Sequence, residues 1–596
     1  MFPRWIRRGE SDLVTARNKT HGKDSEIPSA CFGKTMLQVL LVVFWGLLVL
    51  HLVSLTSTLS IRQLVVSSSL AVRGITADEV DNIQPQTNEA VGGLTEDLVP
   101  PREADKTLGG LTEEFVAQGE ADNTLGGLLL SPELFEDSRC ISRSREYQLR
   151  KPSTFKPSPY LISKLRDYER RHLKCAHEAK KFSPQTNATE QDFGGCRFIV
   201  WMAISGLGNR IMTLTSAFVY ALLTNRVLIV DRGLGTDELF CEPFPSTSWL
   251  LPESFPNEWM NNLGSNSTSK FGFLARNFTF TSSHNGYSYI DIMHSSDKDD
   301  TKFFCANCPS YLSSFPWLFM RSNQYFLPGL HLVPEFHDEL DKMFPERQTV
   351  FHHIVRYLMH PSDAVWGLIS SFYETHLANS QHKVGLQIRV LSDDPALLEV
   401  FPDLVLKCAQ EKKLLPDVAL NTNNSAVGNQ ISNSVSVLVA SLRVVFYNRI
   451  RELYLNHPTT DGQQVGVYTA SHDEVQFLNF LSHDMKALAD MYLLSFSDTL
   501  VTTSWSTFGY VAQGISGVNP WILTKFDTTD TVPEYIKNYG ICNRGISIDP
   551  CFHNTPQMDC ENRGWTTDPG KMLPYIQHCE DVPWGIKIMD PATGGH

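Results

Sequence analysis

The sequence predicts an α/β protein whose two halves flank a cleft. Short apolar runs alternate with segments of helical spacing, first over residues 198–231 and again from residue 383 onward. Strands that alternate with helices are typical of parallel βαβ units. With 596 residues, of which 42% are hydrophobic, the chain is long enough to bury more than one core. Ligands of such folds bind where the strands end, so the cleft is the expected site.

The first predicted element is a membrane anchor. Residues 35–61 contain no Asp, Glu, Lys or Arg, and their apolar core, Met36–Leu55, has 20 residues. That length crosses about 30 Å of hydrocarbon. A basic cluster precedes it, so residues 1–35 are expected to be a cytoplasmic tail and the rest of the chain to be lumenal. A cleaved signal peptide is the alternative, but the apolar run is long and begins late.

Cysteines and glycosylation sequons agree with a lumenal location. Eleven of the 12 cysteines, all but Cys31, follow the predicted anchor, and in an oxidising lumen several are expected to pair. Because eleven is odd, at least one of these thiols is expected to be free or to bond another chain. The predicted N-glycosylation sites on the same side are Asn187, Asn266, Asn277 and Asn423.

Residues 56–138 are expected to form a flexible acidic stem. Gly-Gly pairs that begin at positions 92, 109 and 126 mark a repeat of 17 residues. Copies this short cannot enclose a core, and Gly-Gly opposes order. We interpret the repeats as a tether between the membrane and the globular part. A repeat that binds a partner is the alternative.

The first α/β half is expected over residues 139–380. Residues 198–203 and 227–231 are continuous apolar runs typical of buried strands, and residues 212–223 between them have helical spacing. Residues 303–373 are rich in aromatic side chains and carry loop signals such as PSYLSSFPW. We interpret them as an aromatic region between the two alternating series.

The second half is expected over residues 381–545. Its predicted strands are residues 384–390, 435–441, 465–471 and 499–504. Its predicted helices are residues 443–455, 473–481 and 508–513. Residues 546–596 are interpreted as a cysteine-containing tail.

The turn SGLGNR, which begins at Ser205, has the position of a nucleotide-binding loop without its full motif. Ile211 stands where a dinucleotide fingerprint needs its third glycine, and the Gly-Lys-Ser/Thr of a P-loop is missing. Gly206 and Gly208 either permit a tight turn or shape the wall of a site. Asn209 and Arg210 lie at the start of the predicted helix, where backbone N–H groups and the helix dipole favour an anion.

A phosphate-bearing ligand would have to be bound by local groups, because the net charge of −14 and the pI near 5.8 exclude a general basic surface and a nucleic-acid binder. Arg389 follows an apolar strand, and at the cleft its guanidinium can bind a diphosphate bidentately. The alternative, a buried pair with Asp393 or Asp394, is equally consistent with the spacing.

Two further strand ends are candidates for nucleotide binding. The turn with Ser504, Trp505, Ser506, Thr507 and Phe508 can cap a helix or donate hydroxyl and N–H groups to phosphate oxygens. Ser471, His472 and Asp473 end another strand, where a base or ribose can be recognised. His472 taken alone is more typical of a surface or capping residue.

No metal site is predicted. Asp297, Asp299 and Asp300 offer an Asp-x-Asp pattern, but their polar context favours solvated surface. Cys305 and Cys308 have the spacing of zinc ligands without a second pair, which favours disulfide use.

Several of these segments, in order along the chain, resemble the plant Golgi xyloglucan-type α-1,2-fucosyltransferases (glycosyltransferase family thirty-seven). The resemblance covers about residues 125–590. The matching segments are LGGLL with CISRSREYQLRKPS, SGLGNRIMTLTSAFVYALLTNRVLIVD, PWLFMRSNQYF, FHHIVRYLMHP, VGLQIRV, SWSTFGYVAQG, NYGICNRGISIDPCFH and HCEDVPWGIKIMD. The resemblance implies a GT-B-like fold and an inverting, metal-independent transfer of fucose from GDP-β-L-fucose to a galactosyl hydroxyl. It also implies a single-pass Golgi membrane protein that needs no cofactor.

The resemblance also implies roles for the candidate residues. The second half would hold GDP, with Arg389 on the diphosphate, Ser504–Phe508 as the phosphate turn and Ser471–Asp473 on the guanosine side. Asn209 and Arg210 would face the donor from the first half.

One residue departs from the family pattern. Asn323 stands where members of the family often carry Asp, and an amide cannot accept a proton as a general base at neutral pH. We therefore expect Asn323 to bind the acceptor, with the base elsewhere, replaced by water or not needed.

Other functions are consistent with parts of the sequence. A catalytically inactive Golgi scaffold of the same fold is the main alternative, and a lumenal glycosidase would need a pair of carboxylates that no pattern singles out. Xyloglucan, arabinogalactan protein and pectin are all left open as acceptors, as is a homodimer. The aromatic stretch 315–326 either stacks on sugar rings or belongs to the core.

Overall fold

The computed structural model describes the part of the chain that follows the predicted anchor and most of the stem. The described residues are 123–131, 134–135, 140–185, 188–264, 266–276, 286–296, 298–390, 394–419, 434–525, 536–537, 540–555, 560 and 572–590. The chain divides into two units, residues 1–107 and 108–596, and all described residues belong to the second. No helix among them is both long and apolar enough to span a bilayer, and the predicted anchor lies outside them.

The first half contains a four-stranded parallel sheet in the order β2-β1-β4-β3. Its strands are β1 (Phe198–Met202), β2 (Val227–Val230), β3 (Tyr287–Ile292) and β4 (Trp317–Ser322). Helices α3 (Pro159–Cys175), α4 (Leu207–Thr224) and α11 (Val350–Leu358) pack around it. The predicted strands 198–203 and 227–231 are confirmed to within one residue.

The aromatic region 303–373 contains β4, which the sequence analysis did not predict. Trp317 stacks on Phe198 of β1 with ring centroids 4.2 Å apart, and Phe319 and Tyr325 are also buried. Stretch 315–326 therefore belongs to the core and is not a sugar-stacking surface. The stretch PSYLSSFPW is a loop only over residues 313–316, because its first four residues belong to α8 (Cys308–Leu312) and Trp317 begins β4.

The second half contains a six-stranded sheet in the order β10-β9-β8-β5-β6-β7. Its strands are β5 (His382–Ile388), β6 (Ser434–Ser441), β7 (Gln464–Tyr468), β8 (Thr499–Thr503), β9 (Trp521–Leu523) and the antiparallel β10 (Cys542–Arg544). The predicted strands are confirmed, with β7 three residues shorter. Because β5 to β9 are parallel, their carboxyl ends lie at one edge of the sheet.

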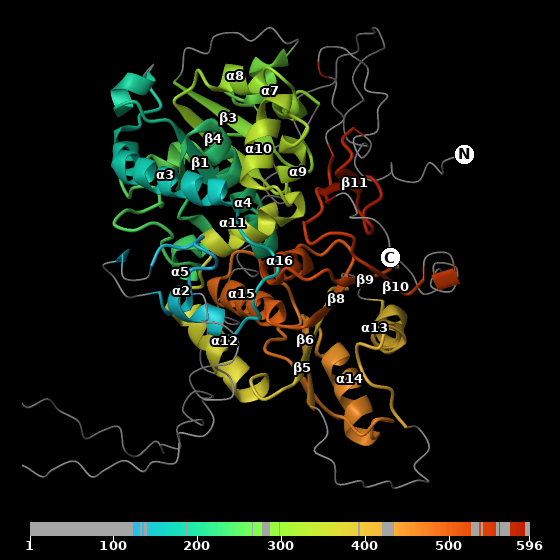
Figure 1. Cartoon of the computed structure of the whole chain (residues 1–596). Coiled ribbons are helices and arrows are strands. Elements are labelled where there is room, and N and C mark those ends of the chain that lie inside the picture. The colour runs from blue at the N-terminus through green and yellow to red at the C-terminus, as the bar shows by residue number, and fades with distance from the viewer. Residues whose placement is uncertain are drawn as a thin grey trace, which may run out of the picture. The chain divides into compact units, whose positions relative to one another are not determined.

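Helices cover both faces of the second sheet. On one face lie α13 (Pro395–Glu411) and α14 (Val444–Asn456), which share a core with β5, β6 and β8. On the other lie α15 (Leu481–Ser495) and α16 (Thr507–Ser516), whose core continues into α4 and α11 of the first half. Figure 1 shows α15, α16 and α11 between the two sheets. The predicted helix 473–481 is wrong, because residues 473–480 form a loop before α15.

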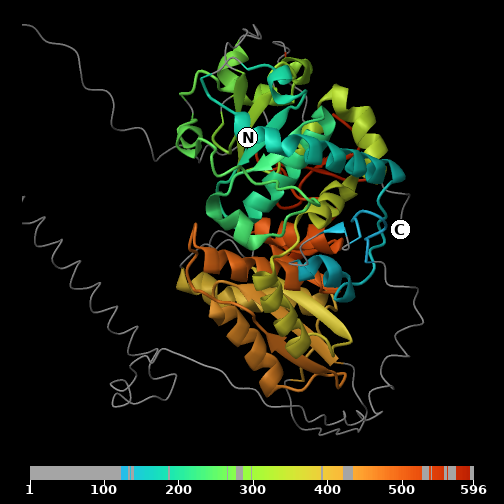
Figure 2. The ribbon, with the colours of Figure 1, turned by 90° about the vertical axis from the view of Figure 1, so that its left-hand side faces the viewer.

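The C-terminal segment 546–590 packs against the first half rather than forming a separate tail. Tyr325 donates a hydrogen bond to the Asp549 carboxylate at 2.6 Å, and the Arg347 backbone N–H donates to Asp590 at 2.8 Å. The segment carries the hairpin β11 (Ile576–His578) and β12 (Ile586–Ile588). In Figure 2 its red ribbon again lies against the teal and green first half.

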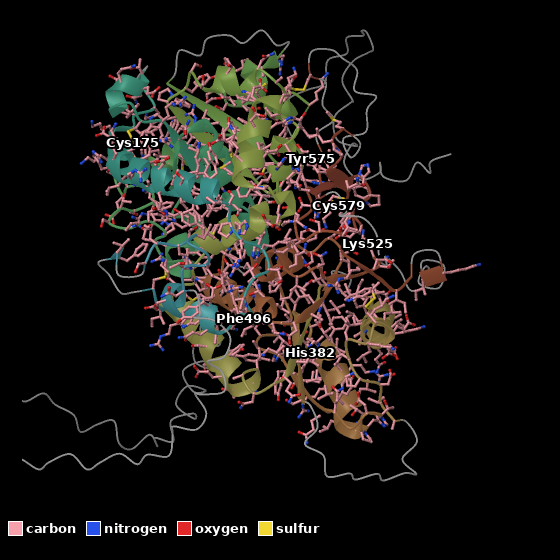
Figure 3. All side chains as sticks on the ribbon, in the orientation of Figure 1. Cys175, His382, Phe496, Lys525, Tyr575 and Cys579 are labelled. Atoms are coloured by element: carbon pink, nitrogen blue, oxygen red, sulfur yellow. A yellow bond between two sulfur atoms is a disulfide. The ribbon has the colours of Figure 1, made fainter. Side chains whose placement is uncertain are left out.

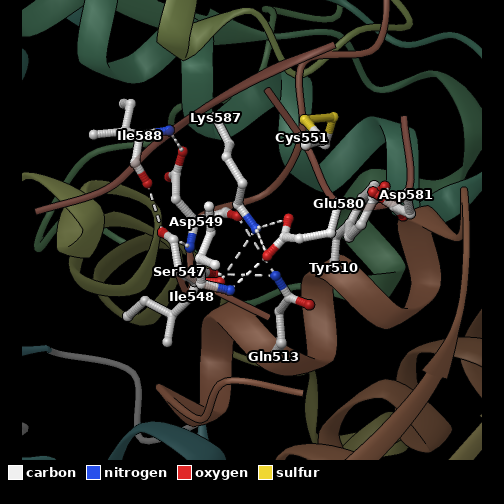
Figure 4. A network of polar contacts seen from close by, with 12 residues as sticks. Tyr510, Gln513, Ser547, Ile548, Asp549, Cys551, Glu580, Asp581, Lys587 and Ile588 are labelled. Atoms are coloured by element: carbon white, nitrogen blue, oxygen red, sulfur yellow. Dashed lines mark hydrogen bonds and ion pairs between the residues drawn. A yellow bond between two sulfur atoms is a disulfide. The ribbon is translucent and has the colours of Figure 1, made fainter. Parts of the chain in front are cut away.

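The same segment is tied to α16 by a network of polar contacts, drawn in Figure 4. The Gln513 amide of α16 donates to the carbonyls of Ile548 and Asp549. Lys587 pairs with Glu580 at 3.1 Å. The C-terminal segment therefore touches both halves of the molecule.

Five disulfides connect described cysteines: Cys140–Cys241, Cys175–Cys196, Cys305–Cys560, Cys408–Cys542 and Cys551–Cys579. Their sulfur atoms are yellow in Figure 3, where Cys175 and Cys579 are labelled. Cys308 is free and buried. This pattern confirms that several of the cysteines pair and accounts for the odd number of cysteines after the anchor.

Two further predictions need correction. Asp300 is buried and forms an ion pair with Lys270 at 2.7 Å, and Asp299 pairs with Lys302 at 2.7 Å, so these two residues are not solvated surface; Asp297 lies outside the described residues. The third copy of the repeat belongs to the folded part, because Leu128 is buried and Gly126 and Gly127 adopt φ values of 76° and 86°. The end of the stem therefore lies before residue 138.

Candidate functional site

A cavity of about 500 Å³ lies where the carboxyl ends of strands from both halves meet. This volume is typical of small-molecule and nucleotide sites. The predicted site residues that line it are Gly206, Gly208, Asn209, Arg210, Arg389, Ser471, Asp473, Thr507 and Phe508. His472, Ser504, Trp505, Ser506 and Asn323 are not among the lining residues.

Arg389 enters the cavity directly after β5. Its backbone N–H donates to the Thr503 hydroxyl at 3.0 Å, and that hydroxyl donates to the Gln387 side chain at 3.1 Å. The ends of β5 and β8 therefore fix the position of the Arg389 backbone.

The Arg389 guanidinium has no carboxylate partner among the described residues. Its one side-chain hydrogen bond there is a long contact of 3.5 Å to Gln476. Burial lowers the pKa of Arg389 from its ordinary value. Asp394 instead caps α13 through the Ala396 N–H at 3.0 Å, and Asp393 lies outside the described residues. A half-buried cation at a cavity without an acidic partner is arranged to bind an anion.

Arg210 carries the same charge in different surroundings. It is buried and forms an ion pair with Asp484 of α15, and it also donates to the Leu234 carbonyl at 2.8 Å. Its charge is therefore neutralised by the protein. The pair joins α4 of the first half to α15 of the second.

Gly208 lies inside the first turn of α4 and allows that helix to approach α16. A Cβ atom at this position would lie 2.7 Å from Thr507 Oγ1 and 3.0 Å from the Thr507 carbonyl carbon. Gly206 has φ −67° and ψ 161°, which any residue adopts. The glycines are therefore not needed for a tight turn, and Gly208 is needed for close packing.

Asn209 links the cavity to the end of β4. Its amide donates to the Asn323 carbonyl at 2.7 Å, and its oxygen accepts from Thr507 at 3.3 Å. The Asn323 side-chain oxygen accepts from the His294 N–H at 2.8 Å and from Gln324 at 3.0 Å. Asn323 thus lies beside the cavity wall.

Two acidic side chains lie in the site near the end of β7: Asp473, in the loop that follows the strand, and the buried Asp490 of α15. Ser471 donates to the Asp490 carboxylate, whose pKa is raised to about 7 by burial. Asp473 pairs with Lys486 and His483, both at 2.8 Å, and the Lys486 hydrogen bond contributes most to lowering its pKa. His472 is exposed, which agrees with its interpretation as a surface residue.

The turn before α16 divides into residues that support the site and residues that line it. Ser506 is buried and caps α16 by accepting from the Gly509 N–H. Ser504 donates to the Leu523 carbonyl of β9. Thr507 and Phe508, in the first turn of α16, reach the cavity.

The sequence analysis missed several lining residues. Arg443 follows β6 at the same sheet edge as Arg389, and Gln476, Phe477 and Asp490 come from the loop before α15 and from α15 itself. The strand-end rule that selected Arg389 would also have selected Arg443. Nothing in the sequence marks Gln476 or Asp490, because a loop and a helix interior carry them.

Other predicted sites are placed as follows. Asn266 is exposed, whereas Asn187, Asn277 and Asn423 lie outside the described residues, so glycosylation stays a prediction at all of them. No group of three or more His, Cys, Asp or Glu side chains with the geometry of a metal site occurs in the described part of the chain.

Two α/β halves that share a cavity at the carboxyl ends of their strands define a GT-B-like glycosyltransferase. The chain belongs to the xyloglucan fucosyltransferase family, whose sequence model matches residues 104–561. It is therefore an enzyme of the fucosyltransferase class.

Characterised relatives cover most of the chain. It is 41% identical over 461 residues to a galactoside 2-alpha-L-fucosyltransferase of Arabidopsis thaliana, across 76% of this chain and 81% of the relative. It is 42% identical over 468 residues to the galactoside 2-alpha-L-fucosyltransferase of Pisum sativum, across 76% and 80%. A solved structure of a variant of Arabidopsis thaliana FUT1 in complex with GDP is similar with a TM-score of 0.71 and 41% identity, across 78% of this chain and 100% of that one.

Proposed function

We propose that this enzyme transfers L-fucose from GDP-β-L-fucose to the 2-hydroxyl of a galactosyl residue in a cell-wall glycan, with inversion and without a metal ion. The names of the relatives support the sugar, the linkage and the acceptor residue. The GDP bound to the similar Arabidopsis structure supports the nucleotide. The predicted anchor and the disulfides support a type II protein of the Golgi membrane with a lumenal catalytic part.

The observation that carries the proposal is the Arg389 guanidinium, which lies at the cavity and has no carboxylate partner among the described residues. When the anomeric bond breaks, the diphosphate gains negative charge, and a fixed donor that meets this charge lowers the barrier. The first turns of α4 and α16 also reach the cavity, and their backbone N–H groups and dipoles favour the same anion. Arg210 stays with Asp484 and supports the wall rather than the diphosphate.

On the acceptor side, we assign Asn323 to binding rather than to proton transfer. Its side-chain oxygen already accepts two N–H groups. A carboxylate in the same place would be stabilised by these donors and would be a weak base.

The test is a transfer assay with the full-length chain purified in detergent. GDP-fucose is supplied with galactose-containing oligosaccharides from xyloglucan, arabinogalactan protein and pectin, with EDTA present, and both free GDP and fucosylated product are measured. We expect transfer to at least one galactoside. Neither GDP release nor product with any acceptor would favour the alternative of an inactive scaffold.

Arg389→Lys tests the mechanism in the same assay. Lysine keeps the charge but loses the planar fork, so turnover is expected to fall at least tenfold and up to about 10³-fold. Arg449→Lys is the matched control and should keep full turnover, because this exposed side chain of α14 pairs with Asp403 of α13.

Asn323→Asp should leave turnover within about threefold of wild type, because its hydrogen-bond donors keep a carboxylate weakly basic.

A further inference from the structure

Two exposed tryptophans lie beside the cavity without lining it. Trp505 is 37% exposed and Trp584 is 55% exposed. Their rings meet edge to face, with centroids 5.2 Å apart and an interplanar angle of 89°. His553 lies 6.1 Å from Trp505, measured between ring centroids. We call Trp505, Trp584 and His553 the aromatic platform. Aromatic side chains that gather in one exposed patch, unlike single exposed residues, are typical of a binding site.

Trp505 is held at the surface in a costly conformation. Its φ of 61° lies in the left-handed region, which is a rare and unfavourable conformation for a bulky residue. The Asp581 carboxylate accepts its backbone N–H at 3.0 Å, and the Asp581 carbonyl accepts its indole N–H at 2.6 Å. Tyr510 donates to the same carboxylate at 2.6 Å; Figure 4 shows Tyr510 and Asp581 together. These hydrogen bonds hold the Trp505 indole at the surface despite its strained backbone.

A chain of contacts leads from the cavity to the platform. Thr507, two residues after Trp505, contacts Asn209, and Asn209 contacts Asn323. The His294 N–H donates to Asn323, and the His294 carbonyl accepts from Asn554 at 2.8 Å. Asn554 follows His553 of the platform. These hydrogen bonds therefore connect Asn323, beside the cavity, to the chain segment that carries His553 of the platform.

We propose that the aromatic platform binds a sugar ring of the acceptor glycan, beyond the residue that receives fucose. This proposal rests on the proposed function. The C–H face of a pyranose stacks on an indole face, and its hydroxyl groups accept or donate hydrogen bonds at the rim. The Trp584 indole N–H has no hydrogen-bond partner among the described residues, so it can donate to such a hydroxyl. The Lys525 ammonium lies 4.0 Å from the centroid of the Trp505 ring and covers one of its faces, which leaves the Trp584 ring as the main stacking surface.

The ligand is a neutral oligosaccharide rather than an acidic one. Stacking on an aromatic ring needs no ion pair. Asp581 and Lys525 place one charge of each sign beside Trp505, so the two together do not make a positive surface that would select an acidic sugar.

Kinetics with acceptors of two lengths test the proposal. The full-length Trp584→Ala enzyme is compared with wild type on a short galactoside and on a long neutral galactose-containing oligosaccharide. Loss of one stacking partner is expected to raise KM for the long acceptor about threefold to tenfold. KM for the short galactoside, KM for GDP-fucose and kcat should stay unchanged. Trp584→Phe should recover most of the affinity. Phe273→Ala, at another exposed aromatic residue, on α7 (Phe271–Leu274), should behave as wild type.

Binding without turnover separates this proposal from the proposed function. Titration of the enzyme with the long neutral oligosaccharide, in the absence of GDP-fucose, should change tryptophan fluorescence in wild type and much less in Trp584→Ala. This readout remains even if no fucose is transferred. An unchanged KM for the long acceptor in Trp584→Ala, or tighter binding of an uronic-acid oligosaccharide than of the neutral one, would overturn the proposal.

Discussion

At the cavity, Arg210 and Arg389 carry the same charge with opposite consequences. Arg210 is paired with Asp484 and fixes the two halves to each other. Arg389 has no acidic partner among the described residues, and its burial without compensation favours a bound anion. Two arginines at one cavity thus have different roles, because the fold places a carboxylate beside Arg210 and none of the described carboxylates beside Arg389.

Asp490 makes the stability of the enzyme depend on pH. Its folded pKa of about 7 lies above its ordinary value of 3.8, so the folded state binds the proton more tightly. The stabilisation of the folded state by the protonated Asp490 carboxyl is fully present below about pH 4. It is lost as pH rises toward 7, by up to about 1.4 kcal/mol per pH unit. Asp490→Asn removes this pH-dependent contribution to the free energy of unfolding. We expect the Tm of the variant relative to wild type to be higher at pH 8 than at pH 5. A difference that stays constant between the two pH values would contradict this.

Among the elements, the apolar strands were the most predictable from sequence. Residues 198–203 are a continuous apolar run and residues 384–390 are mostly apolar, and both form buried strands whose ends reach the cavity. The helix predicted over 473–481 was wrong for a physical reason. Phe477 and Leu478 are apolar residues within the predicted helix, but they are exposed and line the cavity. In the sequence, apolar residues that line a cavity cannot be distinguished from apolar residues that are buried in the core.

The site was predictable only where it follows strand ends. Arg389 was found in this way, whereas Asp490 comes from the interior of α15 and its position depends on tertiary packing. Arg210 and Asp484 are far apart in the chain, and no local pattern in the sequence predicts that they pair. The role of Gly208 was also hidden, because it depends on the approach of a second helix.

Gly208 sets the distance between α4 and α16. In Gly208→Ala the new methyl group would overlap Thr507, including its backbone, so we expect destabilisation of about 1–3 kcal/mol and a higher KM for GDP-fucose. Gly367→Ala is the matched control, since this glycine of α12 (Asp363–His376) has open space around it. There the substitution should be neutral or stabilise by up to about 1 kcal/mol. Equal effects of the two substitutions in thermal unfolding would argue against the helix contact.

At the scale of the whole molecule, a buried ion pair and a continuous core hold the two halves together. Arg210 and Asp484 are 4% and 7% exposed. Asp484→Asn would leave Arg210 buried and unpaired, which typically costs about 3–5 kcal/mol. We expect a large fall in Tm, measured by differential scanning fluorimetry. Asp403→Asn, whose pair with Arg449 is 56–57% exposed, should change stability by less than about 0.5 kcal/mol. Similar losses in both variants would show that burial of the pair is unimportant.

The C-terminal segment also belongs to this scale, because it returns to complete the first half through Asp549, Asp590 and the Cys305–Cys560 disulfide. During synthesis, part of the surface of the first half therefore stays uncovered until residues 546–590 have been made. Apolar surface that is exposed in such a folding intermediate favours aggregation. A chain that lacked this segment would leave that surface of the first half uncovered, and it would also lose the hydrogen bonds that the segment makes to α16 of the second half.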